Sequence, residues 1–348
     1  MRGKIKYQEA FHDVISLIEE SRKRAYQKVN EELVLLYFNI GRMVSEKVEA
    51  GSWGDGSVNE LATFINNRFP ELRGFNRRGL YRMKQFYETY TSDEFVAAWM
   101  THLNRKPDDM PEIVTTLLTQ LQWSSHLHLL SKTKTASEKL FYIELAIAEN
   151  LTVRELERQL NTAVYERTLL VNRNVSVTHK NIPSHLFRDP YIFEFLSLPK
   201  DHSEKDLESA LVQNLKDFIL EVGKGFAYMG NQYRIQVGNK DYYTDLLFFH
   251  RDLQCLVLFE LKIQEFEPEF LGKLNFYLEA LDRDVKRAAE KPSVGILLCK
   301  GKDHEVVEYA MARNISPAVV ADYETRLIPK KVLEEKLHQL NNLIKKDL

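Results

Sequence analysis

The sequence predicts two domains of different fold class: an all-α N-terminal half, and an α/β C-terminal half in which helices flank a mixed sheet. The chain has 348 residues, a length for which two domains are the ordinary expectation. Apolar residues recur at helical spacing up to about residue 168, whereas strand-like runs and helical runs alternate after residue 203. A polar, aperiodic segment around residue 175 separates the two patterns. We therefore predict domains over residues 1–172 and 173–348.

The N-terminal helices are predicted from apolar spacing and from the residues at their ends. The core stripe of the first helix is predicted to comprise Val14, Leu17, Ile18, Leu33, Leu36, Tyr37, Ile40 and Val44. The Gly-rich run that begins at Gly51 ends this helix. Further helices are predicted over residues 58–69, 74–90, 123–132, 137–150 and 152–169, with a loop over residues 107–114. Asn76 is a candidate N-cap, and Thr152 with Glu155 has the spacing of a capping box.

The C-terminal half begins with an amphipathic helix over residues 204–223. Strands are predicted over residues 233–237, 242–250 and 254–262. Short turns at Gly238–Asn239 and at the HRDL sequence (250–253) make these three strands an antiparallel meander. The remaining elements are a helix over 268–285, a strand over 293–300, a helix over 303–314, a strand over 317–323 and a helix over 330–344.

The composition excludes several classes of protein. Apolar residues make up 44% and charged residues 28%, as is usual for globular domains, and the formal net charge is −2. Any surface for a polyanion must therefore be a local patch. Cys255 and Cys299 lie inside apolar runs, which excludes a disulfide framework and a cysteine zinc site and favours a reducing compartment. Neither a signal peptide nor a membrane-spanning run is recognisable, so we expect a cytoplasmic protein without membrane attachment.

Three charged residues in two neighbouring strands suggest a site. Glu260 and Lys262 are two residues apart in a buried-looking strand, so they share one face. If the HRDL turn pairs Phe249 with Gln254, Asp245 lies opposite Leu258 and forms a diagonal pair with Glu260. Glu208, on the helix before the sheet, offers a further carboxylate.

These carboxylates are of the kind that bind Mg²⁺, which takes one or two carboxylates and keeps several waters. Asp245 and Glu260 would hold the metal ion, and Lys262 would position the attacking water and face the developing phosphate charge. The alternative is a salt bridge between Glu260 and Lys262 at a strand end, with Glu208 on a solvated helix face. Asp245 on the neighbouring strand favours the site over the salt bridge.

The C-terminal pattern of an acidic helix, a strand Asp and then Glu–X–Lys resembles the PD-(D/E)XK nuclease superfamily. Residues 203–340 more narrowly resemble the bacterial YhcG-like nucleases through YYTDLLFFHRDLQCLVLFELKIQEFEPEFLGKLNFYLEALD, PSVGILLCK and VVEYAM. The N-terminal half resembles the partner domain of that family through LYFNIGRMVSEK, FPELRGFNRRGLYRMKQFY and WSSHLHLLSK.

The resemblance implies a restriction-endonuclease-like fold, with Asp245, Glu260 and Lys262 as the catalytic core and Glu208 as the outer acid. Thr244 stands where the superfamily's name has Pro. Lys273 stands where many relatives have Gln, and Tyr277 lies one turn on. These last two residues are the candidates for an accessory role on their helix.

A basic helix in the N-terminal half is the candidate DNA-binding element. Its basic residues, with the turn before it, are Arg73, Arg77, Arg78, Arg82 and Lys84. No acid lies between Glu71 and Glu88, and a short helix precedes the segment, as in a helix-turn-helix. Arginine suits phosphate and guanine edges. The alternative is a solvated helix face. The spacing of His126 and His128 puts them on different sides of a helix, so we expect packing or capping residues rather than metal ligands.

The sequence thus predicts a magnesium-dependent DNA endonuclease, with Mn²⁺ as an alternative cofactor and a homodimer as the form that would cut both strands. The resemblance points to DNA repair, recombination or defence against foreign DNA. Two other functions remain open. One is a non-catalytic DNA-binding scaffold on a nuclease fold, which the intact Asp245, Glu260 and Lys262 set disfavours. The other is an RNase.

Overall fold

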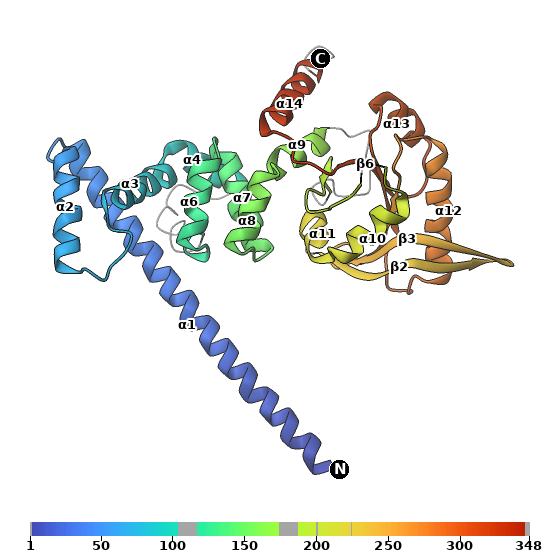
Figure 1. Cartoon of the computed structure of the whole chain (residues 1–348), viewed down its shortest axis with the longest axis horizontal. Coiled ribbons are helices and arrows are strands. Elements are labelled where there is room, and N and C mark those ends of the chain that lie inside the picture. Colours follow the sequence, from blue (N-terminus) through green and yellow to red (C-terminus); the bar gives the residue numbers. More distant parts are fainter. Residues whose placement is uncertain (1, 104–116, 174–186, 200, 224, 345–348) are drawn as a thin grey trace. The chain divides into compact units, whose positions relative to one another are not determined.

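The computed structural model describes residues 2–103, 117–173, 187–199, 201–223 and 225–344 (Figure 1). The chain divides into two compact units, Met1–Leu160 and Asn161–Leu348. The second unit includes α9 (Val164–Arg173), whose Arg167 is fully buried against Glu221. The predicted domain boundary after residue 172 stays a prediction, as does the loop over 107–114, which lies outside the described residues.

The N-terminal unit is helical throughout its described part, as predicted. Its elements are α1 (Arg2–Glu49), α2 (Asp55–Arg68), α3 (Arg77–Thr91), α4 (Asp93–Leu103), the short 3₁₀ helix η2 (Leu118–Gln120), α6 (Trp123–Lys132), α7 (Ala136–Ala148) and α8 (Val153–Asn161). Asn76 caps α3 by accepting the N–H of Gly79 at 2.8 Å, which confirms the predicted N-cap. The capping box is also confirmed, because Thr152 and Glu155 exchange hydrogen bonds.

One of these helices was missed, and one prediction is wrong. Helix α4 was not predicted. The single helix expected over residues 152–169 is broken into α8 and α9, because Ala163 adopts a φ of 52°, which a continuing right-handed helix excludes. The amphipathic pattern runs on through this break, so apolar periodicity alone does not reveal it.

The apolar stripe predicted for the first helix is only partly buried. Tyr37 and Val44 are buried against the rest of the unit, whereas Val14, Leu17 and Ile18 are each more than half exposed. Close packing is confined to the C-terminal part of α1. There Gly41 lies against α3 so closely that an added Cβ would come within 2.0 Å of the carbonyl oxygen of Met83.

His126 is a packing residue of this unit, as predicted. It is fully buried, its Nε2 donates to the carbonyl oxygen of Leu118 at 2.9 Å, and its Nδ1 accepts from the hydroxyl of Tyr90 at 3.1 Å. Burial lowers the pKa of His126 to about 4, although the hydrogen bond to Leu118 acts in the opposite direction. In the folded protein the imidazole therefore stays neutral at pH values well below its ordinary pKa.

We expect the N-terminal unit to lose stability on acidification because of His126. Below about pH 6.5 His126 of the unfolded chain is protonated, whereas in the folded unit it stays neutral down to about pH 4. The free energy of unfolding therefore falls as pH falls through this range. From pH 7 to pH 5 this group alone should cost about 2 kcal/mol. Trp53, Trp99 and Trp123 all lie in this unit, so tryptophan fluorescence during urea unfolding reports on it specifically.

The comparison variant is His126→Gln, which cannot titrate in this range and should flatten the pH dependence by that amount. His128→Gln is the matched control, since His128 is only partly buried. If the free energy of unfolding depends on pH equally in the wild-type chain and in His126→Gln, the depressed pKa does not belong to His126.

The C-terminal unit is built on a six-stranded sheet of order β1-β6-β5-β4-β3-β2. Its strands are β1 (Tyr191–Ile192), β2 (Phe226–Val237), β3 (Lys240–His250), β4 (Cys255–Leu261), β5 (Val294–Cys299) and β6 (Ala318–Glu324). β2, β3 and β4 form the predicted antiparallel meander, and β4, β5, β6 and β1 run parallel. The mixed sheet is therefore confirmed, although the edge strand β1 was not predicted.

Helices cover both faces of this sheet (Figure 1). They are α10 (Glu204–Gln213), α11 (Leu215–Val222), α12 (Glu269–Asp284) and α13 (His304–Met311), and α14 (Lys330–Ile344) packs on α9. The predicted helix over 204–223 is thus two helices, which meet at Asn214.

Each face of the sheet has its own core. Side chains of α10 and α11 pack on the face that carries Phe248 and Phe259, and those of α12 pack on the face that carries Leu247 and Leu258. Because alternate strand residues point to opposite faces, Glu260 is on the α12 face with Leu258. Both cysteines of the chain are buried and free. No described helix is long and apolar enough to cross a membrane.

Candidate active site

The turn between β3 and β4 determines which residues of the two strands face each other. We predicted that Phe249 pairs with Gln254, but in the structure Phe249 pairs with Leu256, two positions further along β4. The turn is formed by residues 251–254 rather than by HRDL, and Gln254 adopts a φ of 55°. The predicted register is therefore wrong by two residues.

This shift brings the two acidic residues closer than predicted. The ladder ends at the pair Leu246 and Phe259, and its next step places Asp245 directly opposite Glu260 instead of diagonal to it. Both remain on one face, because an even shift in register leaves every side chain on its original face. The strand pair therefore aligns the two carboxylates side by side.

Asp245 is tied to the end of β4. Its Oδ2 accepts the backbone N–H of Leu261 at 2.7 Å. Burial and the negative charge of Glu260 raise the pKa of Asp245 to about 7, although the Leu261 N–H and the charges of Lys262 and Lys273 lower it. Two buried carboxylates repel each other when both are ionised. A cation between them would relieve that repulsion.

Glu260 is the most enclosed member of the site, with 0% of its side chain exposed. Its Oε1 accepts from Nζ of Lys262 at 3.1 Å and from Nζ of Lys273 at 2.5 Å. Its Oε2 is buried and has no hydrogen-bond partner among the described residues. A buried carboxylate oxygen without a partner is costly, so Oε2 is the atom that a bound cation would satisfy.

Lys262 follows directly after β4 and is also buried. Its Nζ lies 3.1 Å from Oε1 of Glu260, 3.2 Å from Oε2 of Glu204 and 2.9 Å from the carbonyl oxygen of Leu261. Glu204 was missed in the sequence. It occupies the first turn of α10, four residues before Glu208, and only the packing of α10 on the sheet distinguishes the two acids. The ammonium group is thus held between two carboxylates.

Glu208 is buried but is not part of this cluster. Its carboxylate accepts from the amide of Asn231 at 2.7 Å and from the amide of Gln232 at 2.5 Å. Gln232 adopts a φ of 49°, and its neighbours in β2 pair with the neighbours of Asp245 in β3. Glu208 therefore holds two side chains of β2 beside Asp245, and a direct role for it in the site stays a prediction.

The two accessory candidates lie together on α12. Lys273 Nζ reaches Glu260 and sits 5.3 Å from the ring centroid of Tyr277. Burial lowers the pKa of Lys273, but the hydrogen bond and charge of Glu260 outweigh burial and raise it overall. Tyr277 is buried, and burial raises its pKa. Lys273 is therefore cationic and is 45% exposed, so it can also turn towards a bound anion.

The carboxylates fit a hard divalent cation. Within the described residues no group of three or more histidine, cysteine or acidic side chains forms a metal cluster. Asp245 and Glu260 nevertheless supply adjacent oxygens, one of them unpartnered. Proteins in general bind Mg²⁺ through one or two carboxylates, and the ion keeps several waters. Mn²⁺ also accepts carboxylate and water oxygens.

The basic helix α3 presents an arginine face. Arg77, Arg78 and Arg82 line a shallow open groove together with Tyr81. The guanidinium carbon of Arg77 lies 5.3 Å from the ring centroid of Tyr81. Lys84 lies two turns after Arg77 on the same side of the helix, where it pairs with Glu88. The link from α2 to α3 spans residues 69–76, longer than the three or four residues of a helix-turn-helix turn. Arg73 is exposed in that link.

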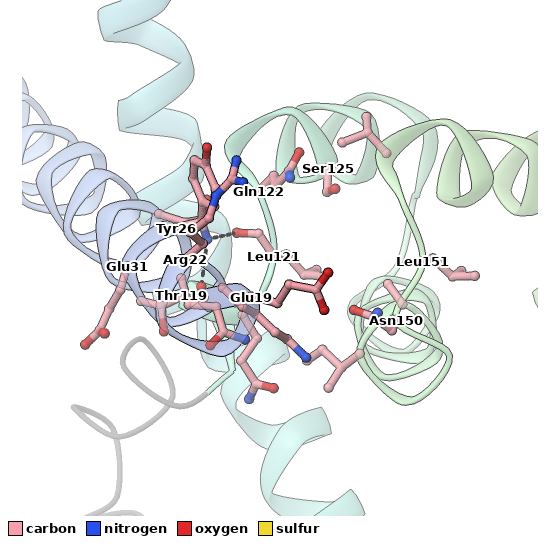
Figure 2. Close-up of a pocket in the computed structure, with 17 residues that line it drawn as sticks. Glu19, Arg22, Tyr26, Glu31, Thr119, Leu121, Gln122, Ser125, Asn150 and Leu151 are labelled. Atoms are coloured by element: carbon pink, nitrogen blue, oxygen red, sulfur yellow. Dashed lines mark hydrogen bonds between the residues drawn. The ribbon is translucent and has the colours of Figure 1, made fainter. Parts of the chain in front are cut away.

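A separate cavity of about 980 Å³ lies within the N-terminal unit. Figure 2 shows Arg22 and Tyr26 of α1 on one wall, with Leu121, just after η2, and Asn150, just after α7, across from them. The side-chain amide of Asn30 closes one end by donating to the carbonyl oxygens of Thr119 and Leu121. Its lining mixes both charges with amides and contains none of the predicted site residues.

Comparison with known proteins gives two family matches and a relative of nearly full length. Residues 184–339 match the YhcG PDDEXK nuclease domain, and residues 13–167 match the DUF1016 N-terminal domain. The chain is 30% identical over 353 residues to "Putative nuclease YhcG" of Escherichia coli (strain K12), covering 95% of this chain and 93% of that protein.

Solved structures give more limited likenesses. A repair endonuclease from Pyrococcus abyssi aligns with 38% of this chain and 50% of its own, at 14% identity and a TM-score of 0.25. EndoMS in its apo form aligns with 38% of this chain and 49% of its own, at 16% identity and a TM-score of 0.24.

Proposed function

The chain belongs to the YhcG family of PDDEXK nucleases, and from that premise we propose that it is a magnesium-dependent DNA endonuclease. The observation that carries the proposal is the buried pair of Asp245 and Glu260, with an unpartnered oxygen on Glu260 and an ammonium group at 3.1 Å. A structural salt bridge alone would leave no buried carboxylate oxygen without a partner.

The residues divide the chemistry between them. Asp245 and Oε2 of Glu260 would hold Mg²⁺, which lowers the pKa of a bound water and stabilises charge on the phosphate. Lys262 would orient the attacking water and stabilise the charge that develops on the phosphoryl oxygens. Glu204 limits the movement of the Lys262 ammonium group. Lys273 is half exposed and would contact the phosphate next to the scissile bond. The Tyr277 ring, 5.3 Å from Nζ of Lys273, would help to position that ammonium group.

The direct test is a cleavage assay on linear, nicked and branched duplexes and on RNA, each with Mg²⁺, Mn²⁺ or EDTA. We expect metal-dependent hydrolysis of duplex DNA. RNA cut in preference to DNA would favour an RNase. DNA binding without hydrolysis of any substrate would favour a scaffold and overturn the proposal. One metal site cuts one strand, so double-strand cuts would require two copies of the chain.

The cellular setting belongs to the same proposal. A nuclease of this kind would serve DNA repair, recombination or defence against foreign DNA. We place it in the cytoplasm, because the sequence has two buried free thiols.

We further propose that the arginine face of α3, with Arg73, contacts DNA phosphates. Replacing both Arg77 and Arg78 with Ala should weaken binding to all duplexes, because phosphate contacts carry no sequence information. Each neutralised phosphate contributes about −0.9 to the slope of log affinity against log salt, so the slope should flatten by roughly two units. Fluorescence anisotropy over a salt series measures both effects.

The matched control removes two positive charges elsewhere, with Arg24→Ala and Lys331→Ala, and should leave the slope unchanged. If the arginine pair changes neither slope nor affinity, α3 presents only a solvated face. If it affects one sequence alone, at least one arginine reads a base edge. Magnesium binding measured by calorimetry without DNA should be the same in all three proteins.

A further inference from the structure

The N-terminal part of α1 has an apolar stripe that no described part of its own unit covers. Every residue from 11 to 29 is exposed, and the N-terminal end of α1 extends beyond the other helices of its unit (Figure 1). The exposed stripe comprises Phe11, Val14, Ile15, Ile18, Val29, Leu33 and Leu36. Most of the stability of a helix in a protein comes from packing an amphipathic face. The stripe therefore needs a partner.

The stripe is distinct from the face by which α1 packs on its own unit. That inner face carries Val34, Tyr37 and Val44, which are buried. At 3.6 residues per turn the stripe lies about a third of a turn round the helix from the inner face. Contact with the described part of the unit therefore leaves the stripe exposed to a partner.

The order of residues in the stripe favours a second copy in antiparallel orientation. Two apolar blocks, residues 11–18 and 25–36, are separated by the polar sequence EESRKR over residues 19–24. An antiparallel copy brings the first block of one helix onto the second block of the other. The apolar pairs that come level are Phe11 with Leu36, Val14 with Leu33 and Ile18 with Val29.

Charge also favours the antiparallel pair. The polar sequence is acidic at its start and basic at its end. In the antiparallel pair Glu19 comes level with Lys28 of the second copy, and Arg22 comes level with Ala25. Lys23 and Arg24 of the two copies also come level, but both lie well away from the stripe, where solvent screens their repulsion. A parallel pair would bring Arg22 of the two copies together at a core position of the coiled coil, where like charges repel.

We propose that α1 forms a homodimer interface, an antiparallel two-helix coiled coil with a second copy of this chain. Its two-fold axis passes between Lys23 and Arg24, and the interface is isologous. The partner is thus a surface of the same sequence, and the interface does not depend on nuclease activity.

Engineered cysteines test the register on the full-length chain. In the double variant Ile18→Cys with Val29→Cys, we expect oxidation to give a covalent dimer, because each cysteine meets the other type on the second copy. The same two positions on one helix are too far apart for a disulfide within the chain. Cys255 and Cys299 are buried, so they should not contribute.

Two controls accompany this variant. Ile18→Cys alone would cross-link only in a parallel pair, so a covalent dimer from it would overturn the antiparallel arrangement. In the second control, Glu20→Cys with Gln27→Cys, each position comes level with the other on the second copy, but both lie on the side of the helix opposite the stripe. Equal cross-linking by that pair would show random collision and would also overturn the proposal.

Light scattering on the uncross-linked chain tests the dimer itself. At micromolar concentration we expect twice the monomer mass of 40.8 kDa. Ile18→Lys with Val29→Lys should give monomers, and Glu20→Lys with Gln27→Lys should remain dimeric. All four positions are exposed, so tryptophan fluorescence should confirm an unchanged fold. A monomeric wild-type chain, or a dimer that survives the stripe lysines, would overturn the proposal.

Discussion

Replacing Glu260 with Gln should abolish metal-dependent cleavage while the chain keeps its fold and its affinity for duplex DNA. The substitution preserves shape but removes the charge, and it replaces one oxygen with an amide nitrogen that cannot bind a metal ion. Because Oε2 has no protein partner among the described residues, the amide nitrogen can take its place while the remaining oxygen still accepts from Lys262 and Lys273. Cleavage rates under single-turnover conditions and duplex binding by anisotropy measure the two properties separately.

Asp245→Asn should behave in the same way, and the double variant should lose little more, because groups that act as one unit are not additive. Glu267→Gln is a suitable control, since this acid is exposed and close in sequence. Calorimetry without DNA should show magnesium binding in the control and not in Glu260→Gln. A Glu260→Gln protein that cuts at the wild-type rate would refute the assignment of the metal site.

The grouping of three charged residues could be predicted because strand residues alternate between faces. Asp245, Glu260 and Lys262 were placed on one face from the sequence alone, and that placement tolerated a register error of two residues. The register itself could not be predicted. The turn lies at residues 251–254 and not at the predicted 250–253, because Gln254 adopts a positive φ that its residue type does not announce. Hydrophobic alternation along a strand is the same for every register that differs by an even number of residues, so it cannot choose between such registers.

Helical patterns predicted less about tertiary contact. Glu204 and Glu208 are four residues apart, so they lie near one another on α10. Spacing alone could not show that Glu204 reaches Lys262 while Glu208 binds Asn231 and Gln232. In α1 the apolar stripe was recognised, but periodicity shows that a face is apolar and not which surface covers it.

The breaks between helices were missed for a related reason. Ala163 and Asn214 interrupt helices whose apolar pattern continues on both sides. Neither residue is a Gly or Pro, the strongest local signals for a helix end. After the breaks, α9 packs on α14 and α11 packs on β1, and these distant partners leave no local signal in the sequence.

Replacing Lys262 with Ala should lower the rate of the chemical step by about 10²- to 10⁴-fold, the usual range for a group that moves a proton or stabilises charge in the transition state. Magnesium affinity should stay the same or rise, because a positive charge 3.1 Å from a metal-binding carboxylate is removed. Single-turnover cleavage at saturating metal isolates the chemical step, and calorimetry without DNA gives the metal affinity.

The salt-bridge alternative makes the opposite prediction for the same variant. If Lys262 only neutralises Glu204 and Glu260, its removal leaves buried carboxylate charge uncompensated and destabilises the C-terminal unit. Activity per folded molecule would then be unchanged, whereas a catalytic lysine predicts folded protein with a slow chemical step. Lys331→Ala, at an exposed position, should change neither quantity. Because Lys262→Arg keeps the charge but not the geometry of a compact ammonium group, it should preserve stability and still lose most of the rate.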